Sequence, residues 1–315
     1  MTKVDGQSRS PLARLLFSPD EHRLRAGWRL AAQASLQIVL TLAIGCAALA
    51  LPVTWSTRLL DPSSIWGLGT GELAELGVVT LSVWLVRRLL DHRSFVSLGV
   101  RLHPQAYRDL VAGLGIAALI MGFIFVAEWC LGWLSVAGFA WKTDSAGTVV
   151  GSSLAFFVIF VLVGWNEELM SRGYHLQTIA SGLNLGWALV ISSAIFGALH
   201  LTNPHATLMS AAGIFLAGLL LGYAYLRTGQ LWCSIGLHIG WNFCEGVVFG
   251  FPVSGLTTFR LLDTRIGGPD MWTGGAFGPE AGLIVVPATL AGAALLYFYG
   301  RQTYARAAAN PSRSV

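Results

Sequence analysis

Charge is scarce in this sequence. Charged residues make up 11% of the 315-residue chain, while 54% of its residues are hydrophobic. A soluble domain carries about 25% charged residues, so the composition excludes an ordinary soluble protein. Apolar runs of about 20 residues, the length that crosses a bilayer core, recur along the chain. The sequence therefore predicts an integral, multi-pass membrane protein surrounded by lipid.

Cysteine and lysine are also rare. No CxxC pair occurs, and all four cysteines lie inside apolar runs: Cys46, Cys130, Cys233 and Cys244. This pattern excludes a disulfide framework and a thiolate zinc site. Lys3 and Lys142 are the only lysines, so arginine supplies nearly all of the positive charge. Such usage is typical of a GC-rich bacterial genome, and we expect the inner membrane of a bacterial cell.

The apolar runs predict an all-α fold with about eight transmembrane helices. The first run is longer than the hydrophobic region of a signal peptide, so we expect it to remain as a membrane helix. The expected spans are 28–51, 70–90, 109–135, 148–178, 184–201, 206–226, 231–250 and 281–299.

The arginines predict the orientation of these spans. They gather before the first span, between the second and third, after the sixth and after the last. The opposite loops carry few basic residues: Arg58, Lys142, Arg260 and Arg265. Cytoplasmic loops are enriched in arginine and lysine, so both termini are expected in the cytoplasm. The same placement favours a topological role for the net charge of +4 over nucleic-acid binding.

The chain divides into six segments by composition. Residues 1–27 form a polar cytoplasmic segment, 28–147 three helices, and 148–250 four helices that carry the polar motifs. A Gly- and Pro-rich external loop is expected over 251–280, a last helix over 281–300, and a disordered cytoplasmic tail over 301–315.

The stretch WNEELMSRGYHL, residues 165–176, places three ionisable groups beside the apolar run 151–164. On a helix Glu168 and Arg172 are four residues apart and share a face, so they can pair. Glu167 points about 100° away from Glu168 and lacks a partner on its own helix. An unpaired buried carboxylate is costly, which indicates that another group uses Glu167.

Two further apolar runs carry polar side chains at helical spacing. SSAIFGALHL contains His200, four residues after Phe196, and LHIGWNFCEG contains His238 and Asn242 one turn apart. Each alone is compatible with a hydrogen-bonded core residue or with polar contacts between helices. Together with Glu167 they supply a base, an electrophile or ligand, and a hydrogen-bond donor on three spans. Ionisable residues inside membranes usually face a cavity and mark function; we expect them to meet in the inner half of the bilayer.

These motifs resemble those of the CAAX protease and bacteriocin-processing (CPBP, or Abi) family, to which the CAAX prenyl endoprotease belongs. The family pattern is EExxxR, FxxxH and HxxxN on successive helices, here EELMSR, FGALH and HIGWN. The likeness covers about residues 148–250. Ser171 departs from it, since many members carry an aromatic residue there, and a packing change is expected.

The resemblance implies an intramembrane endopeptidase acting on a membrane-associated protein or peptide, with a cavity reached from the cytoplasm. Glu167 and His200 would activate water, and His238 and Asn242 would hold the oxyanion. Glu168 and Arg172 would fix the helix and tune Glu167. The favoured mechanism needs no cofactor.

Other possibilities remain open at this stage. Glu167, His200 and His238 would also suit a zinc ion with an open water position. A non-proteolytic membrane scaffold or a bacteriocin-immunity protein is the alternative within the family. A proton-coupled transporter could use buried Glu and His, but it predicts an inverted repeat, which the sequence does not show.

Overall fold

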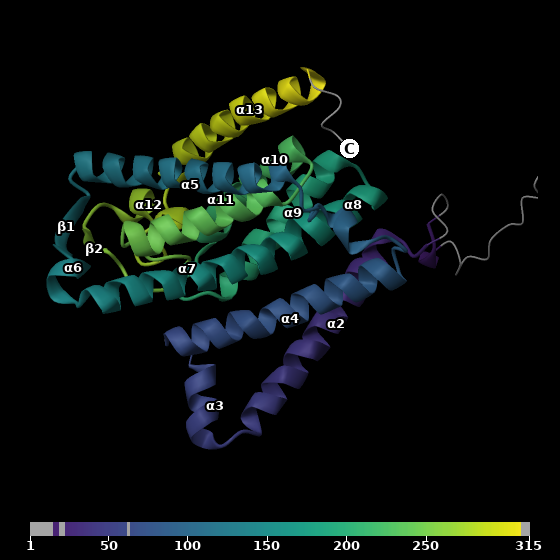
Figure 1. The fold of residues 1–315 in the computed structure, drawn as a ribbon, viewed down its shortest axis with the longest axis horizontal. Coiled ribbons are helices and arrows are strands. Elements are labelled where there is room, and N and C mark those ends of the chain that lie inside the picture. Colours follow the sequence, from purple (N-terminus) through teal and green to yellow (C-terminus); the bar gives the residue numbers. More distant parts are fainter. Residues whose placement is uncertain (1–14, 19–22, 62–63, 310–315) are drawn as a thin grey trace, which may run out of the picture.

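Long helices dominate the structure, a computed structural model that describes residues 15–18, 23–61 and 64–309 (Figure 1). Within these residues six helices are long and apolar enough to cross a membrane. They are α2 (Ala26–Leu49), α4 (Ile65–Leu89), α5 (Pro104–Cys130), the continuous stretch Ala146–Gly182, α9 (Leu185–Leu199, extended to Thr202 by the 3-10 turn η3) and α10 (Leu208–Thr228). The prediction of an all-α, multi-pass membrane protein is confirmed.

Two further helices stand where the seventh and eighth spans are expected. The first joins α11 (Trp232–Asn242) to η4 (Phe243–Val248), and the second is α13 (Val285–Ala309). The count of eight spans stays a prediction. Because α13 is helical through Ala309, it occupies residues 301–309 of the expected disordered tail; residues 310–315 lie outside the described part.

Several short elements lie outside the expected spans. Helix α3 (Val53–Leu60) follows α2, and 3-10 helix η1 (Phe95–Leu98) follows α4. Strand β1 (Leu134–Phe139) pairs antiparallel with β2 (Leu262–Ile266). Helices α6 (Ala140–Thr143) and α12 (Asp270–Thr273) and 3-10 helix η5 (Pro279–Ala281) complete this end of the molecule. The Gly- and Pro-rich loop 251–280 is thus structured and held by the sheet.

Local sequence signals explain where the motif-bearing helices begin and end. Asn184 caps α9 by accepting a hydrogen bond from the Trp187 amide at 3.0 Å. Thr207 and Ser210 form a reciprocal capping box at the start of α10. Helix α10 ends at Gly229, whose φ of 66° is the left-handed conformation that glycine adopts at helix ends.

Close backbone contact places α11 at the centre of the helical bundle. Every residue of α11 from Cys233 to Asn242 is buried. A Cβ at Gly113 of α5 would lie 2.3 Å from the Cys233 carbonyl oxygen, and one at Gly236 would lie 2.1 Å from the Leu110 oxygen. Glycine at both positions therefore lets α5 and α11 touch backbone to backbone.

Buried ion pairs join α2 and α4 to α8 (Gln177–Gly182) at the arginine-rich end of the molecule. Asp91 pairs with Arg29 of α2 and with Arg87 of α4. The distance from Nη1 of Arg87 to Oδ2 of Asp91 is 3.2 Å. Arg29 also donates to the Ser181 hydroxyl at 2.7 Å. Arg29 and Gln33 are the only buried residues of α2, and Leu30 and Leu36 of the same helix pack partly buried against the core. Figure 1 shows that α2 lies close to α4 at this end and diverges from the bundle as it runs away from it.

One stretch of π-helix contains the end of the first polar motif, including Arg172, and a second follows the last motif. Helix α7 (Ala146–Glu168) continues as π-helix η2 (Leu169–Leu176), and α11 continues as π-helix η4. A π-helical turn bonds residue i to i+5 and is rare, and it occurs frequently at functional sites. Both stretches begin within two residues of a motif residue.

Candidate active site

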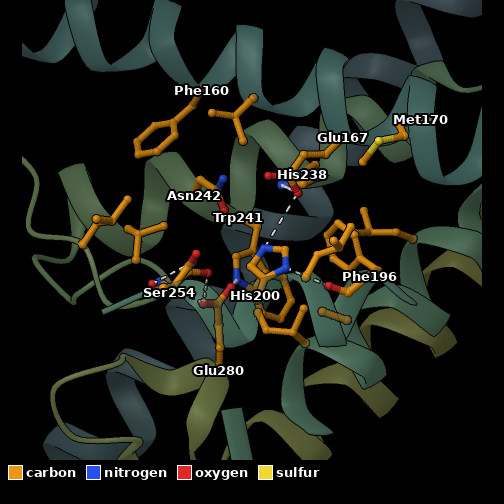
Figure 2. Close-up of a pocket in the computed structure, with 18 of the residues that line it drawn as sticks. Phe160, Glu167, Met170, Phe196, His200, His238, Trp241, Asn242, Ser254 and Glu280 are labelled. Atoms are coloured by element: carbon orange, nitrogen blue, oxygen red, sulfur yellow. Dashed lines mark hydrogen bonds and ion pairs between the residues drawn. The ribbon is translucent and has the colours of Figure 1, made fainter. Parts of the chain in front are cut away.

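A cavity of about 420 Å³ lies between the motif-bearing helices and the loops at the arginine-poor end. Four of the expected residues line it together: Glu167, His200, His238 and Asn242. Glu167 belongs to α7, His200 to η3 at the end of α9, and His238 and Asn242 to α11; Figure 2 shows these four side chains around the cavity. The structure therefore brings together four of the six residues singled out from the sequence. Glu168 and Arg172 lie outside the lining, fully buried behind it.

Glu167 faces both histidines. Its Oε2 atom lies 3.8 Å from Nε2 of His200 and 3.8 Å from Nε2 of His238. This oxygen is buried and has no hydrogen-bond partner among the described residues. The separation exceeds a direct hydrogen bond, and a water molecule about 2.8 Å from both Oε2 and an imidazole nitrogen fits the geometry. The three side chains thus surround one small space.

The backbone of α9 fixes the tautomer of His200. Its Nδ1 lies 2.8 Å from the Phe196 carbonyl oxygen, one turn earlier. A carbonyl only accepts hydrogen bonds, so Nδ1 carries the proton. In the neutral ring Nε2 is then a lone pair directed at Glu167. The FxxxH spacing has a physical role here, because the Phe196 ring also contacts the imidazole, with ring centroids 4.7 Å apart and the planes tilted by 59°.

His238 is held by a buried network that includes Glu168 and Arg172. Nδ1 of His238 lies 2.9 Å from Oε1 of Glu168, which also accepts from Arg172 at 2.7 Å. The expected i,i+4 ion pair is therefore present. Arg172 donates further to the Gly218 carbonyl at 3.1 Å, and its guanidinium lies 4.2 Å from the centre of the Phe196 ring.

This network sets what Nε2 of His238 can do. Glu168 is an acceptor when ionised, so Nδ1 of His238 carries a proton. Nε2 is a hydrogen-bond donor only when the ring is an imidazolium. A positive charge on His238 would neutralise the negative charge of Glu167, as Arg172 neutralises that of Glu168. These two carboxylates and two cations would then carry no net charge. The arrangement suits a positively charged donor beside the water position.

Asn242 lies one turn beyond His238 on the same helix face. It is 7% exposed and lines the cavity. Its carboxamide makes no hydrogen bond to the described residues and is labelled on the cavity wall in Figure 2. A buried amide is normally hydrogen-bonded. This one is available to a group inside the cavity.

Sequence reasoning missed Glu280, which the external loop brings to the cavity beside His200 (Figure 2). Its Oε1 accepts from the Trp241 indole at 3.1 Å, and its Oε2 accepts from the Ser254 amide at 3.0 Å and hydroxyl at 2.6 Å. Burial raises the pKa of Glu280, and the nearby histidines and Ser254 oppose the shift. No motif marks this residue, because its position depends on how the loop folds back.

Glu72 and Glu75 of α4 were also missed, although they lie in an apolar run. Both line the cavity, as does Gln37 of α2. Glu72 accepts a hydrogen bond from Asn166 at 3.1 Å, which places it beside the motif helix. Two carboxylates one turn apart inside the expected span 70–90 were the available signal.

The cavity lies nearer the arginine-poor end than expected. Its lining includes Thr202, Asn203, Ser254, Leu256 and Glu280 from the loops at that end. Within the described residues, none of the loop 90–103 at the arginine-rich end contributes to it. The lining does not support the expected approach from the arginine-rich end, which is predicted to be cytoplasmic.

The metal alternative was considered from the same geometry. Among the residues that the structure describes, no three His, Cys, Asp or Glu side chains are arranged to hold a metal ion. The zinc set expected from the sequence was Glu167, His200 and His238, and its carboxylate oxygen is equidistant from the two nitrogens. The carboxylate and imidazole donors suit zinc. The 3.8 Å separations between Oε2 of Glu167 and the two Nε2 atoms are wider than in a cluster that holds a metal ion, since no such cluster occurs among the described residues.

Comparison with known proteins agrees with the motifs. An uncharacterised 24.3 kDa protein of Escherichia coli is 24% identical over 197 residues, covering 59% of this chain and 86% of the relative. A family model described as type II CAAX prenyl endopeptidase Rce1-like matches residues 149–244. The matched segment contains all four motif residues on the cavity and excludes Glu72, Glu75 and Glu280. Residues 149–244, the segment that carries the motifs, are thus similar to the Rce1-like, type II CAAX prenyl endopeptidase family.

Proposed function

We propose that this protein is an intramembrane endopeptidase that hydrolyses a peptide bond in a membrane-associated protein or peptide. The observation that carries the proposal is the buried, unpartnered Oε2 of Glu167, which lies 3.8 Å from the Nε2 atoms of His200 and His238. The family supports proteolysis at the level of the domain. We place the protein in the inner membrane of a bacterial cell.

Glu167 and His200 activate the attacking water in this mechanism. The water donates to Oε2 of Glu167 and to the lone pair of His200 Nε2, which the Phe196 carbonyl keeps unprotonated by fixing the tautomer. One proton leaves the water as its oxygen attacks the carbonyl carbon. General-base assistance of this kind contributes roughly 10²–10⁴-fold.

His238 and Asn242 stabilise the tetrahedral intermediate. The imidazolium Nε2–H of His238 and the carboxamide N–H of Asn242 donate to the oxyanion. Glu168 orients His238 and favours its charged form. When the C–N bond breaks, the proton taken from water passes to the leaving nitrogen, so the products are a carboxylic acid and an amine.

The proposed mechanism requires no metal ion. A histidine nitrogen bound to zinc carries no proton, so His238 cannot ligate zinc and donate to the oxyanion from the same Nε2. Activity of the purified protein should therefore survive dialysis against a chelator. Activity that is lost on chelation and restored by zinc, together with stoichiometric zinc that is absent from His238→Ala, would establish the metal mechanism instead.

The function is tested by quantitative proteomics of membranes that contain wild type, Glu167→Gln or His200→Ala. We expect new peptide termini in a membrane-associated substrate with wild type and none with either variant. His205→Asn is the matched control, because His205 is exposed, lies outside the cavity lining and tolerates asparagine at its φ of 59°.

A protein that acts by binding alone, such as a scaffold or an immunity protein, would give a different result. Its phenotype would persist in Glu167→Gln and His200→Ala when both variants insert and fold. Unchanged termini between wild type and Glu167→Gln would refute the proteolytic function.

A further inference from the structure

The cavity has an apolar lining that includes several carboxyl groups. Four carboxylates line it, and no lysine or arginine is present among the described lining residues. Arg172 lies behind the wall and is engaged by Glu168 and by the Gly218 carbonyl. The imidazolium proposed for His238 is therefore the one cation that the described lining offers to an anionic ligand.

The four carboxylates have different partners. Glu167 faces the two histidines, and Glu280 is engaged by Trp241 and Ser254. The remaining two are Glu72 and Glu75 on α4. Glu72 has only the neutral amide of Asn166 as a hydrogen-bond donor, and Glu75 has no donor among the described residues.

Glu72 and Glu75 lie beside the reacting groups. They are one turn apart on α4, and both are close enough to Glu167 to experience its charge. The two carboxyl groups repel each other when both are ionised, and a cation placed between them offsets that repulsion and favours the ionised form. Because Glu72, Glu75 and Glu167 line one cavity, a long side chain near the scissile bond would extend toward Glu72 and Glu75.

Asn242 provides an independent indication that a ligand occupies the same cavity. Its carboxamide is more than nine-tenths buried, lines the cavity and makes no hydrogen bond to the described residues. A polar group in this state normally has a hydrogen-bond partner, and a bound molecule in the cavity can supply one. A peptide carbonyl supplies that partner, and the same peptide would carry a side chain toward Glu72 and Glu75.

We propose that Glu72 and Glu75 form a subsite for a basic side chain, lysine or arginine, next to the scissile bond of the substrate. The proposal rests on the peptidase function proposed above and adds the substrate class. It also means that the cavity does not accept a free C-terminal carboxylate near Glu72 and Glu75, since the carboxylates would repel it.

Binding is tested first, without requiring hydrolysis. The protein is the full chain with Glu167→Gln in lipid nanodiscs, and the probes are short, labelled apolar peptides that differ at one central residue: Lys, Arg, Gln or Glu. Hydrogen bonds to charged groups contribute about 1.5–3 kcal/mol. We therefore expect the Lys and Arg peptides to bind roughly tenfold or more tightly than the Gln peptide, and the Glu peptide to bind least.

Variants then locate the preference. Glu72→Gln and Glu75→Gln together should reduce the Lys-to-Gln affinity ratio toward one. Asp263→Asn removes an exposed carboxylate outside the cavity and should leave the ratio unchanged. Equal binding of the Lys and Gln peptides, a ratio that persists in the double variant, or tighter binding of a peptide with its free carboxylate at the cavity would overturn the proposal. The comparison of the Lys and Gln peptides uses only the Glu167→Gln protein, so it tests the proposal even if the double variant does not fold.

Hydrolysis by the protein with Glu167 intact separates the two proposals. Cleavage that ranks Lys and Arg above Gln supports both. Equal cleavage of all peptides refutes the basic subsite and leaves the peptidase function standing. A binding preference with no cleavage of any peptide refutes the peptidase function and leaves the subsite standing.

Discussion

Arg172→Ala tests the buried network behind His238. Arg172 is 1% exposed and has three partners that alanine would remove: the Glu168 carboxylate, the Gly218 carbonyl and the Phe196 ring. Glu168, which is 0% exposed, would keep only His238 as a partner. The substitution therefore leaves a carboxylate with half of its stabilising contacts inside the membrane-embedded bundle.

The expected magnitude follows from burial. Removing one partner of a buried ion pair costs about 3–5 kcal/mol, because the other charge remains in a low-dielectric environment. Loss of the cation–π contact with Phe196 adds about 0.5–1 kcal/mol. We expect the free energy of unfolding to fall by about 3–5 kcal/mol and the yield of folded protein to fall with it.

The measurement is reversible unfolding of the purified protein in mixed micelles, with wild type and both arginine variants compared under one condition. The matched control is Arg260→Ala, because Arg260 forms an exposed pair with Asp263 in which both side chains are 44% exposed. An exposed pair contributes about 0–1 kcal/mol. A free-energy change for Arg172→Ala no larger than that of Arg260→Ala would refute the reasoning. Full stability with lost turnover would place Arg172 in the chemical step.

The other predictions concern the oxyanion site, the loop anchor and the topology. Asn242→Ala should lower kcat by about 10²–10³ while unfolding is unchanged; normal turnover would exclude an oxyanion role. Since burial raises the pKa of Glu280, its stabilising contribution is present at low pH and is lost as pH rises through the folded-state pKa. Glu280→Gln should therefore flatten the pH dependence of unfolding, and an unchanged profile would contradict this. In a cysteine-free background, Arg101→Cys should react with an impermeant reagent from the cytoplasmic side and Asp263→Cys from the external side; the reverse pattern would overturn the predicted orientation.

Helical spacing explains why part of the site could be predicted from sequence. The pairs Glu168–Arg172 and His238–Asn242 lie on shared helix faces because residues four apart are neighbours. Glu167 could be singled out because it had no partner on its own helix. Polar side chains in apolar runs are costly, so their positions were informative before any packing was known.

Features that depend on distant segments could not be predicted in the same way. Strand β1 pairs Leu134 with Ile266, and short strands so far apart in sequence carry no local signal for each other. Glu280 reaches His200 only because the loop after η4 folds back over the cavity. Glu72 and Glu75 carried a signal, but their relation to Glu167 required knowing that α4 packs on α7.

The π-helical stretches have a consequence for length variation in the chain. A turn bonded i to i+5 holds one residue more than an α-helical turn, so deleting one residue from 173–176, after Arg172, can restore α-helix and keep α8 in phase. The same deletion within Ala146–Glu168 rotates residues on either side by about 100° relative to each other. Loss of a residue there turns Glu167 away from His200 and His238 or displaces the wall formed with α4. Natural or engineered single-residue changes in length should thus be tolerated just after the motifs and excluded just before them.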